Sequence, residues 1–413
     1  MKCKSFHKTL FTVSAQGGAQ ILSAAVGIIA VRSMPVQEFV LYTLIVSLAA
    51  SIFVAANSGF VASLFGIGGR LDGRDAARFI RSLISWQRKN CVIAAILSAP
   101  ITAAIAWSTL GSLSAVAISL VLTPLLVLAN ASANSASQVC IMKADRAAIY
   151  RGLYFTSLTR VVLASCLAVG KVGFAAIFVL VNVTGFMASR ATQNGVLRKL
   201  VGNSNDVWSD SQRREVSQKQ RKLLPSSLYL GFQSQIGVVT LGLAGAAGAV
   251  ADLGALNRFA IAYAVVISAV SVTVMPLIAR AEQHEVGRLF VLVALAVIAI
   301  ATSFLLVTLL WPEIFLLMLG SQYSHLREVL PTWSVAFGLM TLAESLASCN
   351  AARGHVRSAW LEVPISLGVI VSSTLWLNYD NVIDPLHLMI ALMSVRLAVQ
   401  LLVYAAELRT AKH

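Results

Sequence analysis

Ionisable side chains inside long apolar runs are the residues of this sequence best placed to do chemistry. Arg160, Arg396 and Glu344 each stand well inside such a run, and Arg258 stands nearer the end of one. A charge at the depth of a bilayer costs about 2.5–3.5 kcal/mol on insertion scales, so it normally faces a partner or a water-filled cavity. The planar guanidinium suits phosphate because it donates two parallel hydrogen bonds. The three arginines are therefore predicted to bind an anionic, phosphate-bearing substrate.

The carboxyl group of Glu344 has two interpretations. In the first, it forms an internal ion pair with Arg396, which lies in the same half of the chain. In the second, it binds and releases a proton during a working cycle, because burial favours the neutral form of an acid. Arg160 differs from both residues, since no acidic residue lies within the apolar runs of the first half of the chain. We therefore expect Arg160 to face an aqueous cavity.

Amide side chains at helical spacing mark further binding positions. Asn130, Asn134 and Gln138 fall on one face of a single apolar run, Gln20 lies in the first run, and Gln235 lies in the seventh. Small and hydroxyl residues in apolar helices are explained by close helix packing. Long amides need hydrogen-bond partners, which sugar hydroxyls or water would supply. These five residues are predicted to contact the substrate.

The elements that must position these residues cross a membrane. The 413 residues are 58% apolar and 12% charged, with a mean hydropathy of +0.80, whereas soluble domains carry about 25% charged residues. The apolar runs are continuous and about 20 residues long, which predicts transmembrane helices and an all-α integral membrane protein. Twelve spans are predicted, at residues 9–31, 39–64, 91–109, 115–142, 152–170, 173–189, 223–245, 253–279, 289–311, 331–350, 359–377 and 385–405.

The distribution of Lys and Arg predicts the orientation of these spans, because basic residues near span ends stay on the cytosolic side. Most of the 32 basic residues fall on one side when the N-terminus is placed inside, so both termini are predicted to be cytosolic. The net charge of +15 then reflects topology and gives no support to nucleic-acid binding. Three segments follow: an N-terminal six-helix lobe at 1–200, a basic cytosolic linker at 201–222, and a C-terminal six-helix lobe at 223–413.

A weak internal repeat accompanies this division. A shift of 215 residues places Gln20 and Ile21 on Gln235 and Ile236, so that the first span overlays the seventh. Six spans precede the long middle loop and six follow it. Because six is even, both lobes begin on the same side of the membrane. The repeat therefore predicts two lobes related by a pseudo-two-fold axis along the membrane normal.

A motif at the end of the first span resembles that of a known transporter family. Arg32, Pro35, Glu38, Phe39 and Tyr42 lie in the segment RSMPVQEFVLY, which is similar to the R-x-L-P-x-x-x-[FY]-G-x-[YW] signature of bacterial polysaccharide and O-antigen flippases of the Wzx type. These belong to the multidrug/oligosaccharidyl-lipid/polysaccharide exporter (MOP) superfamily. The segment departs from the signature at residue 40, where valine replaces the usual glycine.

The resemblance implies export of an undecaprenyl-pyrophosphate-linked oligosaccharide, an O-antigen or exopolysaccharide repeat unit, by alternating access through a cationic cavity. It implies residence in the bacterial inner membrane, with membrane lipids and other polysaccharide assembly proteins as partners. No catalytic residue, metal site or cofactor is expected, because the sequence lacks a nucleotide-binding loop and metal-ligand spacing among its six histidines. Two alternatives remain open: a cation-coupled multidrug exporter of the same superfamily, and a glycan-transferring membrane enzyme.

Overall fold

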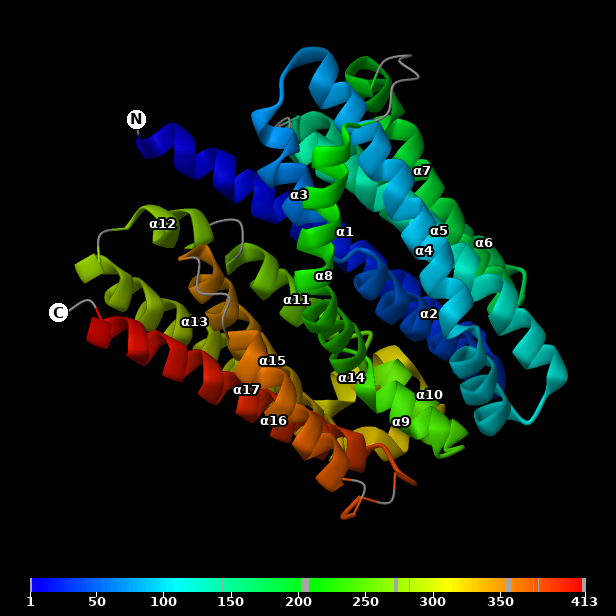
Figure 1. Cartoon of the computed structure of the whole chain (residues 1–413). Helices are drawn as coiled ribbons and strands as arrows, with labels where there is room; N and C mark the ends of the chain where they lie inside the picture. Colours follow the sequence, from blue (N-terminus) through cyan, green and yellow to red (C-terminus); the bar gives the residue numbers. More distant parts are fainter. Residues whose placement is uncertain are drawn as a thin grey trace. The chain divides into compact units, whose positions relative to one another are not determined.

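A computed structural model of the chain describes residues 2–142, 145–201, 208–270, 274–281, 283–353, 358–373, 375–377 and 379–410. All the regular elements in these ranges are helical (Figure 1). Long continuous apolar segments without alternation cannot form barrel strands, so their backbone groups are satisfied within each helix. The predicted all-α integral membrane fold with about twelve transmembrane helices is confirmed.

The described helices form two compact units, which are not contiguous in the sequence. Unit 1 comprises Met1–Arg32 and Gly248–His413, and unit 2 comprises Ser33–Ala247. The first long helix thus packs with the C-terminal part of the chain. The seventh predicted span packs with the N-terminal part. The lobe boundaries predicted from the sequence, at residues 200 and 223, describe the order of spans along the chain and stay a prediction.

Unit 2 is built around four long helices that lie side by side, α4 to α7, with α2 packed on α4, α5 and α7 (Figure 1). Its core near one end joins Phe60, Phe79, Leu83 and Val139, each fully buried. Its elements are α2 (Val36–Ala56), α3 (Phe60–Gly66), η1 (Gly68–Arg70), α4 (Gly73–Leu110), α5 (Leu113–Met142), α6 (Arg146–Val169), α7 (Ala175–Val201), α8 (Asp210–Gln233) and α9 (Ile236–Leu243).

Unit 1 has α15 at its centre, in contact with α11, α13 and α17. A core cluster joins Val270, Phe290, Val297 and Leu346 from these helices. The elements are α1 (Lys2–Ser33), α10 (Ala247–Leu256), α11 (Ala260–Ala269), α12 (Met275–Arg280), α13 (Gln283–Leu310), α14 (Pro312–Leu319), η3 (Ser321–Glu328), α15 (Leu330–Ala352), α16 (Ser358–Ser373) and α17 (Ile383–Thr410).

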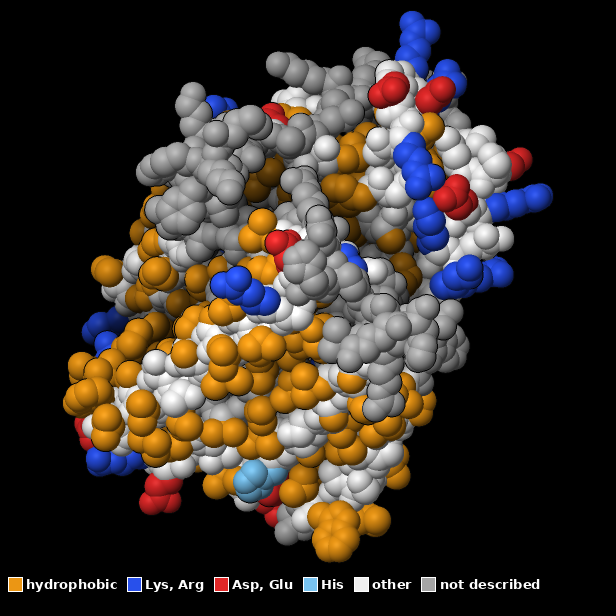
Figure 2. Space-filling view, turned by 90° about the vertical axis from the view of Figure 1, so that its left-hand side faces the viewer, with side chains coloured by type: hydrophobic (Ala, Val, Ile, Leu, Met, Phe, Trp, Pro, Cys, Tyr) orange, Lys and Arg blue, Asp and Glu red, His pale blue; other side chains and the backbone are white. Residues whose placement is uncertain are grey.

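Seven described helices are long and apolar enough to cross a bilayer, and two bent pairs raise the number to nine. The first and eleventh predicted spans coincide with α1 and α16, of which shorter apolar portions are described. The seventh is formed by the end of α8 together with α9, and a turn at Ser234–Gln235 separates the two. Figure 2 shows the corresponding surface, where apolar side chains cover much of the visible face and Lys and Arg gather mainly at its upper right.

The predicted linker continues into the seventh span as one helix. Helix α8 begins at Asp210, within the predicted linker, and ends at Gln233, within the predicted seventh span. Ser209 and Gln212 form a reciprocal capping box at its start, which satisfies two backbone N–H groups that a helix end leaves free. Val216, within the basic segment, is buried in the core cluster of unit 2, and the linker at 201–222 stays a prediction.

The second and eighth predicted spans break in the same way. The N–H of Asn57 donates to the carbonyl of Phe53 at 2.9 Å, and the N–H of Asn257 donates to that of Leu253 at 2.9 Å. Each asparagine begins a short turn, after which α3 and α11 start. The two breaks lie 200 residues apart. The shift of 215 residues that overlays the first span on the seventh therefore does not overlay these breaks. The internal repeat thus contains a length difference between its halves.

Candidate functional site

Arg160 lies in the middle of α6, and its guanidinium is packed against α7 in unit 2. The guanidinium carbon lies 4.3 Å from the centre of the Phe186 ring, in cation–π geometry. Gly185 makes room for it, since a Cβ there would lie 2.6 Å from Arg160 Cγ and Nε. Nε and Nη2 are buried and have no hydrogen-bond partner among the described residues. A buried N–H donor without an acceptor costs free energy, unless a ligand or a water molecule accepts its hydrogen bond.

Tyr42, a residue of the sequence motif, is brought next to Arg160 by the packing of α2. Its side chain is buried and interacts electrostatically with Arg160. Asn182 on α7 donates a hydrogen bond from Nδ2 to the Tyr42 hydroxyl at 3.1 Å. Tyr42 also packs edge-on against Phe178, at 6.4 Å between ring centroids. A cation, a hydroxyl and an amide thus meet at one place in unit 2.

The other residues of the motif have structural contacts, mostly with the backbone or within the core. Pro35 precedes the first residue of α2, and Glu38 Oε2 accepts a hydrogen bond from the N–H of Ala175 at 2.7 Å. That carboxylate therefore caps the start of α7, where a negative charge is favoured by the helix dipole. Phe39 is fully buried. Arg32 lies in unit 1 and donates from Nη2 to the carbonyl of Leu317. Among these five residues, Tyr42 is the one beside a candidate ligand group.

The amide stripe predicted on span four is present on α5. Gln138 Nε2 donates to Asn134 Oδ1 at 3.5 Å, and Asn134 Nδ2 is buried with no partner among the described residues. Asn130 is half-buried. The stripe is helical, as expected, and Asn134 keeps an unused donor. The binding role of these three residues stays a prediction.

A neighbouring amide network was missed at the level of sequence. Gln87 on α4 donates from Nε2 to Asn57 Oδ1 at 2.6 Å and accepts from the Ser135 hydroxyl at 2.6 Å. Gln87 is fully buried. Each of the three residues is polar within or beside an apolar run, but they come from three helices. The network holds the break in α2–α3 against α4 and α5.

Arg396 lies in the middle of α17 in unit 1, between two carboxylates. Its Nη1 lies 2.8 Å from Glu344 Oε1 and its Nη2 donates to Oε2 at 3.1 Å, so the pair is bidentate. Its Nε lies 3.4 Å from Glu362 Oε1, an ion pair without hydrogen-bond geometry. The Arg396 side chain is 7% exposed. The ion pair between Glu344 and Arg396 considered from the sequence is therefore formed.

Glu362 on α16 was missed, although it lies inside the predicted span 359–377. It satisfies the criterion that selected Glu344, an acid within an apolar run, and its side chain is the more buried, 6% exposed against 34%. Asn350 donates to Gln400 Oε1 at 2.9 Å one turn along α17 from Arg396. With all three groups ionised the cluster of Arg396, Glu344 and Glu362 carries a net charge of −1, so a proton or cation would neutralise it.

The remaining predicted residues have other neighbours within their own units. Arg258 follows the break in α10–α11 and passes against α1 at Gly27, where a Cβ would collide with Arg258 Cδ. Gln20 on α1 donates from Nε2 to the Ser268 hydroxyl at 3.3 Å, and its buried Oε1 has no partner among the described residues. Gln235 lies at the turn before α9 and is half-buried. The substrate-binding roles of Arg258, Gln20, Gln235, Arg160 and Arg396 stay predictions.

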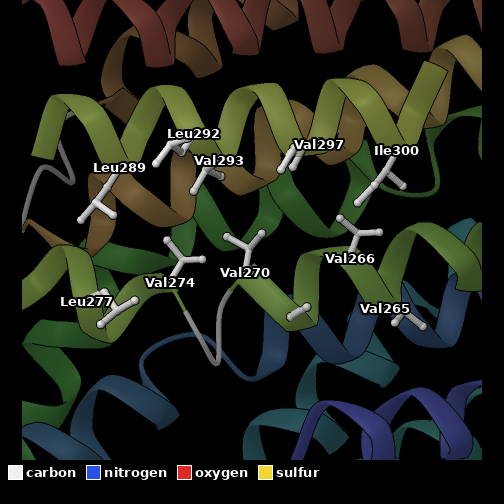
Figure 3. A pocket seen from close by; sticks show the side chains of 12 residues that line it. Val265, Val266, Val270, Val274, Leu277, Leu289, Leu292, Val293, Val297 and Ile300 are labelled. Carbon is white, nitrogen blue, oxygen red and sulfur yellow. The ribbon is translucent and has the colours of Figure 1, made fainter. Parts of the chain in front are cut away.

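An apolar pocket of about 480 Å³ opens between α11–α12 and α13 in unit 1 (Figure 3). Val266, Val270 and Val274 point across it toward Val293 and Val297, and no charged residue lines it. Both walls belong to membrane-crossing segments. An acyl chain of the surrounding bilayer fits such a groove as well as an isoprenoid chain, so the pocket by itself does not identify a substrate.

No group of three or more His, Cys, Asp or Glu side chains that could hold a metal ion occurs in the part of the chain that the structure describes. What the polar clusters can do is bind, exchange protons and orient a ligand. Unit 2 offers a cation with unused donors, and unit 1 offers paired carboxylates around an arginine.

Comparison with known proteins adds the fold class. No protein-family model and no curated protein sequence matches the chain. Among solved structures, the lipid II flippase MurJ in an inward closed conformation has a TM-score of 0.71 at 10% identity, over 95% of this chain and 87% of that one. An inward-facing multidrug resistance MATE family transporter of the MOP superfamily has a TM-score of 0.68 at 14% identity, over 94% of this chain and 95% of that one.

A third solved structure, a MOP superfamily transporter from Pyrococcus furiosus, has a TM-score of 0.65 at 14% identity, over 98% of this chain and 95% of that one. The three agree over nearly the whole chain, although the identity is low. The chain therefore is a multi-pass membrane protein with the fold of MOP-superfamily transporters. These similarities show the fold, and the superfamily and the Wzx type expected from the motif stay predictions.

Proposed function

We propose that this chain is a flippase that moves an undecaprenyl-pyrophosphate-linked oligosaccharide from the cytosolic to the periplasmic leaflet by alternating access. The observation that carries the proposal is Arg160, a buried guanidinium with two donor atoms unused and no carboxylate partner among the described residues. Such a group attracts an anion and repels a cation. A pyrophosphate offers the paired oxygens that a guanidinium fork binds best.

Tyr42 beside Arg160 and the amides on α5 of the same unit support a glycan-bearing ligand. Tyr42 supplies a hydroxyl that can donate and accept, and the buried Asn134 Nδ2 supplies a donor on α5. In this proposal Arg160 binds the pyrophosphate, and the amides of the same unit, Asn130, Asn134, Gln138 and Gln235, bind sugar hydroxyls. Arg258, Arg396 and Gln20 of unit 1 remain separate predicted binding residues. The isoprenoid chain stays in the bilayer. The likeness to MurJ, named as a lipid II flippase, is consistent with a lipid-linked substrate.

We propose that the carboxylates around Arg396 couple substrate transport to a proton gradient. Glu344 was the candidate from sequence, and Glu362 shares its arginine partner. One proton on the pair would make the cluster neutral, and a buried cluster is least costly when its charges balance. Glu362 makes the weaker contact with Arg396, so it is the group that a proton would occupy first. Neutralisation would then release part of the attraction that ties α16 to α17.

A cation-coupled multidrug exporter is the second candidate. The net negative cluster in unit 1 favours it, since a cationic drug needs a carboxylate. The two functions place the decisive residue in different units: Arg160 for a pyrophosphate lipid, and Glu362 with Glu344 for a cation. No chemical step on the substrate is proposed in either case. The proposed location is the bacterial inner membrane with both termini cytosolic, and other polysaccharide assembly proteins are proposed partners.

The test is reconstitution of the purified protein in lipid vesicles. Movement of an undecaprenyl-pyrophosphate-linked oligosaccharide across the bilayer is measured with and without a proton or sodium gradient. We expect protein-dependent movement that a proton gradient accelerates. Absence of movement under every gradient, with the folded protein present and a cationic dye exported instead, would establish the second candidate.

The coupling proposal has its own variant pair. Glu362→Gln keeps the size of the side chain and removes its charge, and we expect flipping to continue down a substrate gradient while acceleration by the proton gradient is lost. Glu313→Gln, on an exposed carboxylate paired with Arg327, is the matched control. Equal acceleration in the Glu362→Gln variant and in the wild type would rule out this site for coupling.

A further inference from the structure

A basic groove between α4 and α7 in unit 2 lies outside the site described above. It has a volume of about 520 Å³ and is lined by Arg81 and Arg88 from α4 and by Arg190 and Arg198 from α7, with Ser85 and Asn194 between them. No acidic residue lines it. Arg88 and Arg190 interact electrostatically, and two like charges held this close repel each other. Four arginines around one hollow therefore form a site that an anion stabilises.

Arg190 is held in place by a contact with the protein backbone. Arg190 donates a hydrogen bond from Nη1 to the carbonyl of Ser132 on α5 at 3.3 Å. A guanidinium has five N–H donors, so the remaining ones are available to a ligand in the groove. Asn194 and Ser85 add neutral donors beside it. This combination of fixed and flexible donors suits the several oxygens of a phosphate.

The level of the groove along the helices identifies the kind of anion. Arg88 precedes the apolar stretch of α4 that begins at Cys91, and Arg190 follows directly after the apolar stretch of α7. Both arginines thus lie where the helices leave the hydrocarbon. Arg81 and Arg198 are seven and eight residues further out, about 10–12 Å along a helix. The polar layer of a bilayer leaflet is on the order of 5–8 Å deep, so the groove covers the level of lipid headgroups.

We propose that this groove binds the phosphate-bearing headgroup of an anionic phospholipid, whose acyl chains remain in the bilayer beside α4 and α7. The predicted topology puts this end of both helices at the cytosolic surface, where basic residues attract anionic lipid. The inference does not depend on the flippase function, because Arg160 lies at mid-membrane depth on α6 and takes no part in the groove. A bound lipid here would hold the ends of α4 and α7 together while the protein works.

Native mass spectrometry of the full-length protein in detergent tests the proposal directly. Phosphatidylglycerol and phosphatidylcholine with the same acyl chains are titrated in parallel, and inorganic phosphate and pyrophosphate are added as competitors. We expect phosphatidylglycerol to bind at least about tenfold more tightly than phosphatidylcholine. Equal binding of the two lipids, or displacement of phosphatidylglycerol by inorganic phosphate at equal concentration, would overturn the proposal in favour of a free-anion site or no site.

Variants locate the binding in the groove. The double change Arg88→Gln and Arg190→Gln should weaken phosphatidylglycerol binding roughly 10- to 30-fold, whereas Arg88→Lys with Arg190→Lys should keep most of it. Arg213→Gln, an exposed arginine on α8 in the same unit, should have no effect. If the Arg88→Gln, Arg190→Gln variant does not elute as a folded protein, the double change Arg81→Gln and Arg198→Gln replaces it. We expect this second variant to lose less affinity for phosphatidylglycerol. Wild-type binding by a folded groove variant would refute the site.

Discussion

Two arginines in the middle of long apolar helices, one in each unit, have opposite surroundings. Arg396 is held by two carboxylates, with contacts of 2.8 and 3.4 Å. Arg160 is stacked on Phe186 and keeps two buried donor atoms without a partner among the described residues. Both cost free energy to place in a membrane. The charge of Arg396 is therefore balanced by the protein itself, whereas no carboxylate balances Arg160 among the described residues, and the proposed function assigns that part to a bound anion.

The glycines opposite the arginines sharpen this comparison. Gly185 faces Arg160 and Gly27 faces Arg258, and in each case a Cβ would collide with the arginine side chain. No glycine contact with Arg396 occurs among the described residues. A neighbour without a side chain thus leaves the space that each arginine side chain occupies. Arg160 and Arg258, both predicted to bind the substrate, share this arrangement.

The largest expected effect is on the stability of unit 1 after removal of Arg396. Arg396→Ala leaves the buried Glu362 and the partly exposed Glu344 without their cation, which should cost about 3–5 kcal/mol. The thermal unfolding midpoint in detergent should fall by on the order of 10 °C. As a control, Arg396→Met combined with Glu344→Gln and Glu362→Gln should recover most of the loss. A single variant as stable as the wild type would show that the pair is not a structural element.

The opposite result is expected for Arg160. Arg160→Ala removes no ion pair, so its unfolding midpoint should stay close to that of the wild type. Flipping of the pyrophosphate-linked lipid should fall about 100-fold, because two charge-assisted hydrogen bonds to phosphate are lost. Arg160→Lys should restore part of the rate, since it keeps the charge but not the planar fork. Normal flipping by the alanine variant would remove Arg160 from the site.

A change at Gly185 tests the position of the Arg160 side chain and leaves its charge unchanged. Gly185→Ala places a Cβ where Arg160 Cγ and Nε now lie, at 2.6 Å, so the side chain must move while its charge is kept. We expect flipping to fall by roughly tenfold, because a displacement of about 1 Å at a binding group has costs of that order. Gly195→Ala on the same helix, where a Cβ meets nothing within 4 Å, is the matched control. Equal rates for both variants would mean that the placement of Arg160 is unimportant.

The smallest effect is expected at Tyr42. Tyr42→Phe removes the hydroxyl that accepts from Asn182 at 3.1 Å and keeps the ring packed on Phe178. One neutral hydrogen bond contributes about 1 kcal/mol, so the flipping rate should fall by about fivefold with little change in stability. Phe39→Leu, at a buried position without a polar atom, should instead lower stability without a selective effect on substrate. The reverse pattern would make Tyr42 a packing residue.

Sequence reasoning found the helices and the arginines because both depend on local composition. A continuous apolar run of about 20 residues has one stable conformation in a bilayer, whichever helices surround it. For the same reason an ionisable residue such as Arg160 or Glu344 stands out from its run without any knowledge of its neighbours. Glu362 could have been found by the same rule. The fold class was therefore available from the 413 residues alone.

The tertiary structure decided which of these residues meet. Arg396 and Glu362 are 34 positions apart on different helices, and Gln87, Asn57 and Ser135 come from three segments. The sequence carries no signal for such contacts, because helix periodicity shows which face a residue occupies but not which helix packs against it. The grouping of α1 with α10 to α17, and of α8 and α9 with α2 to α7, likewise follows from side-chain packing between elements distant in the chain. Packing between helices therefore decides that Arg396 has carboxylate partners and that Arg160 has none among the described residues.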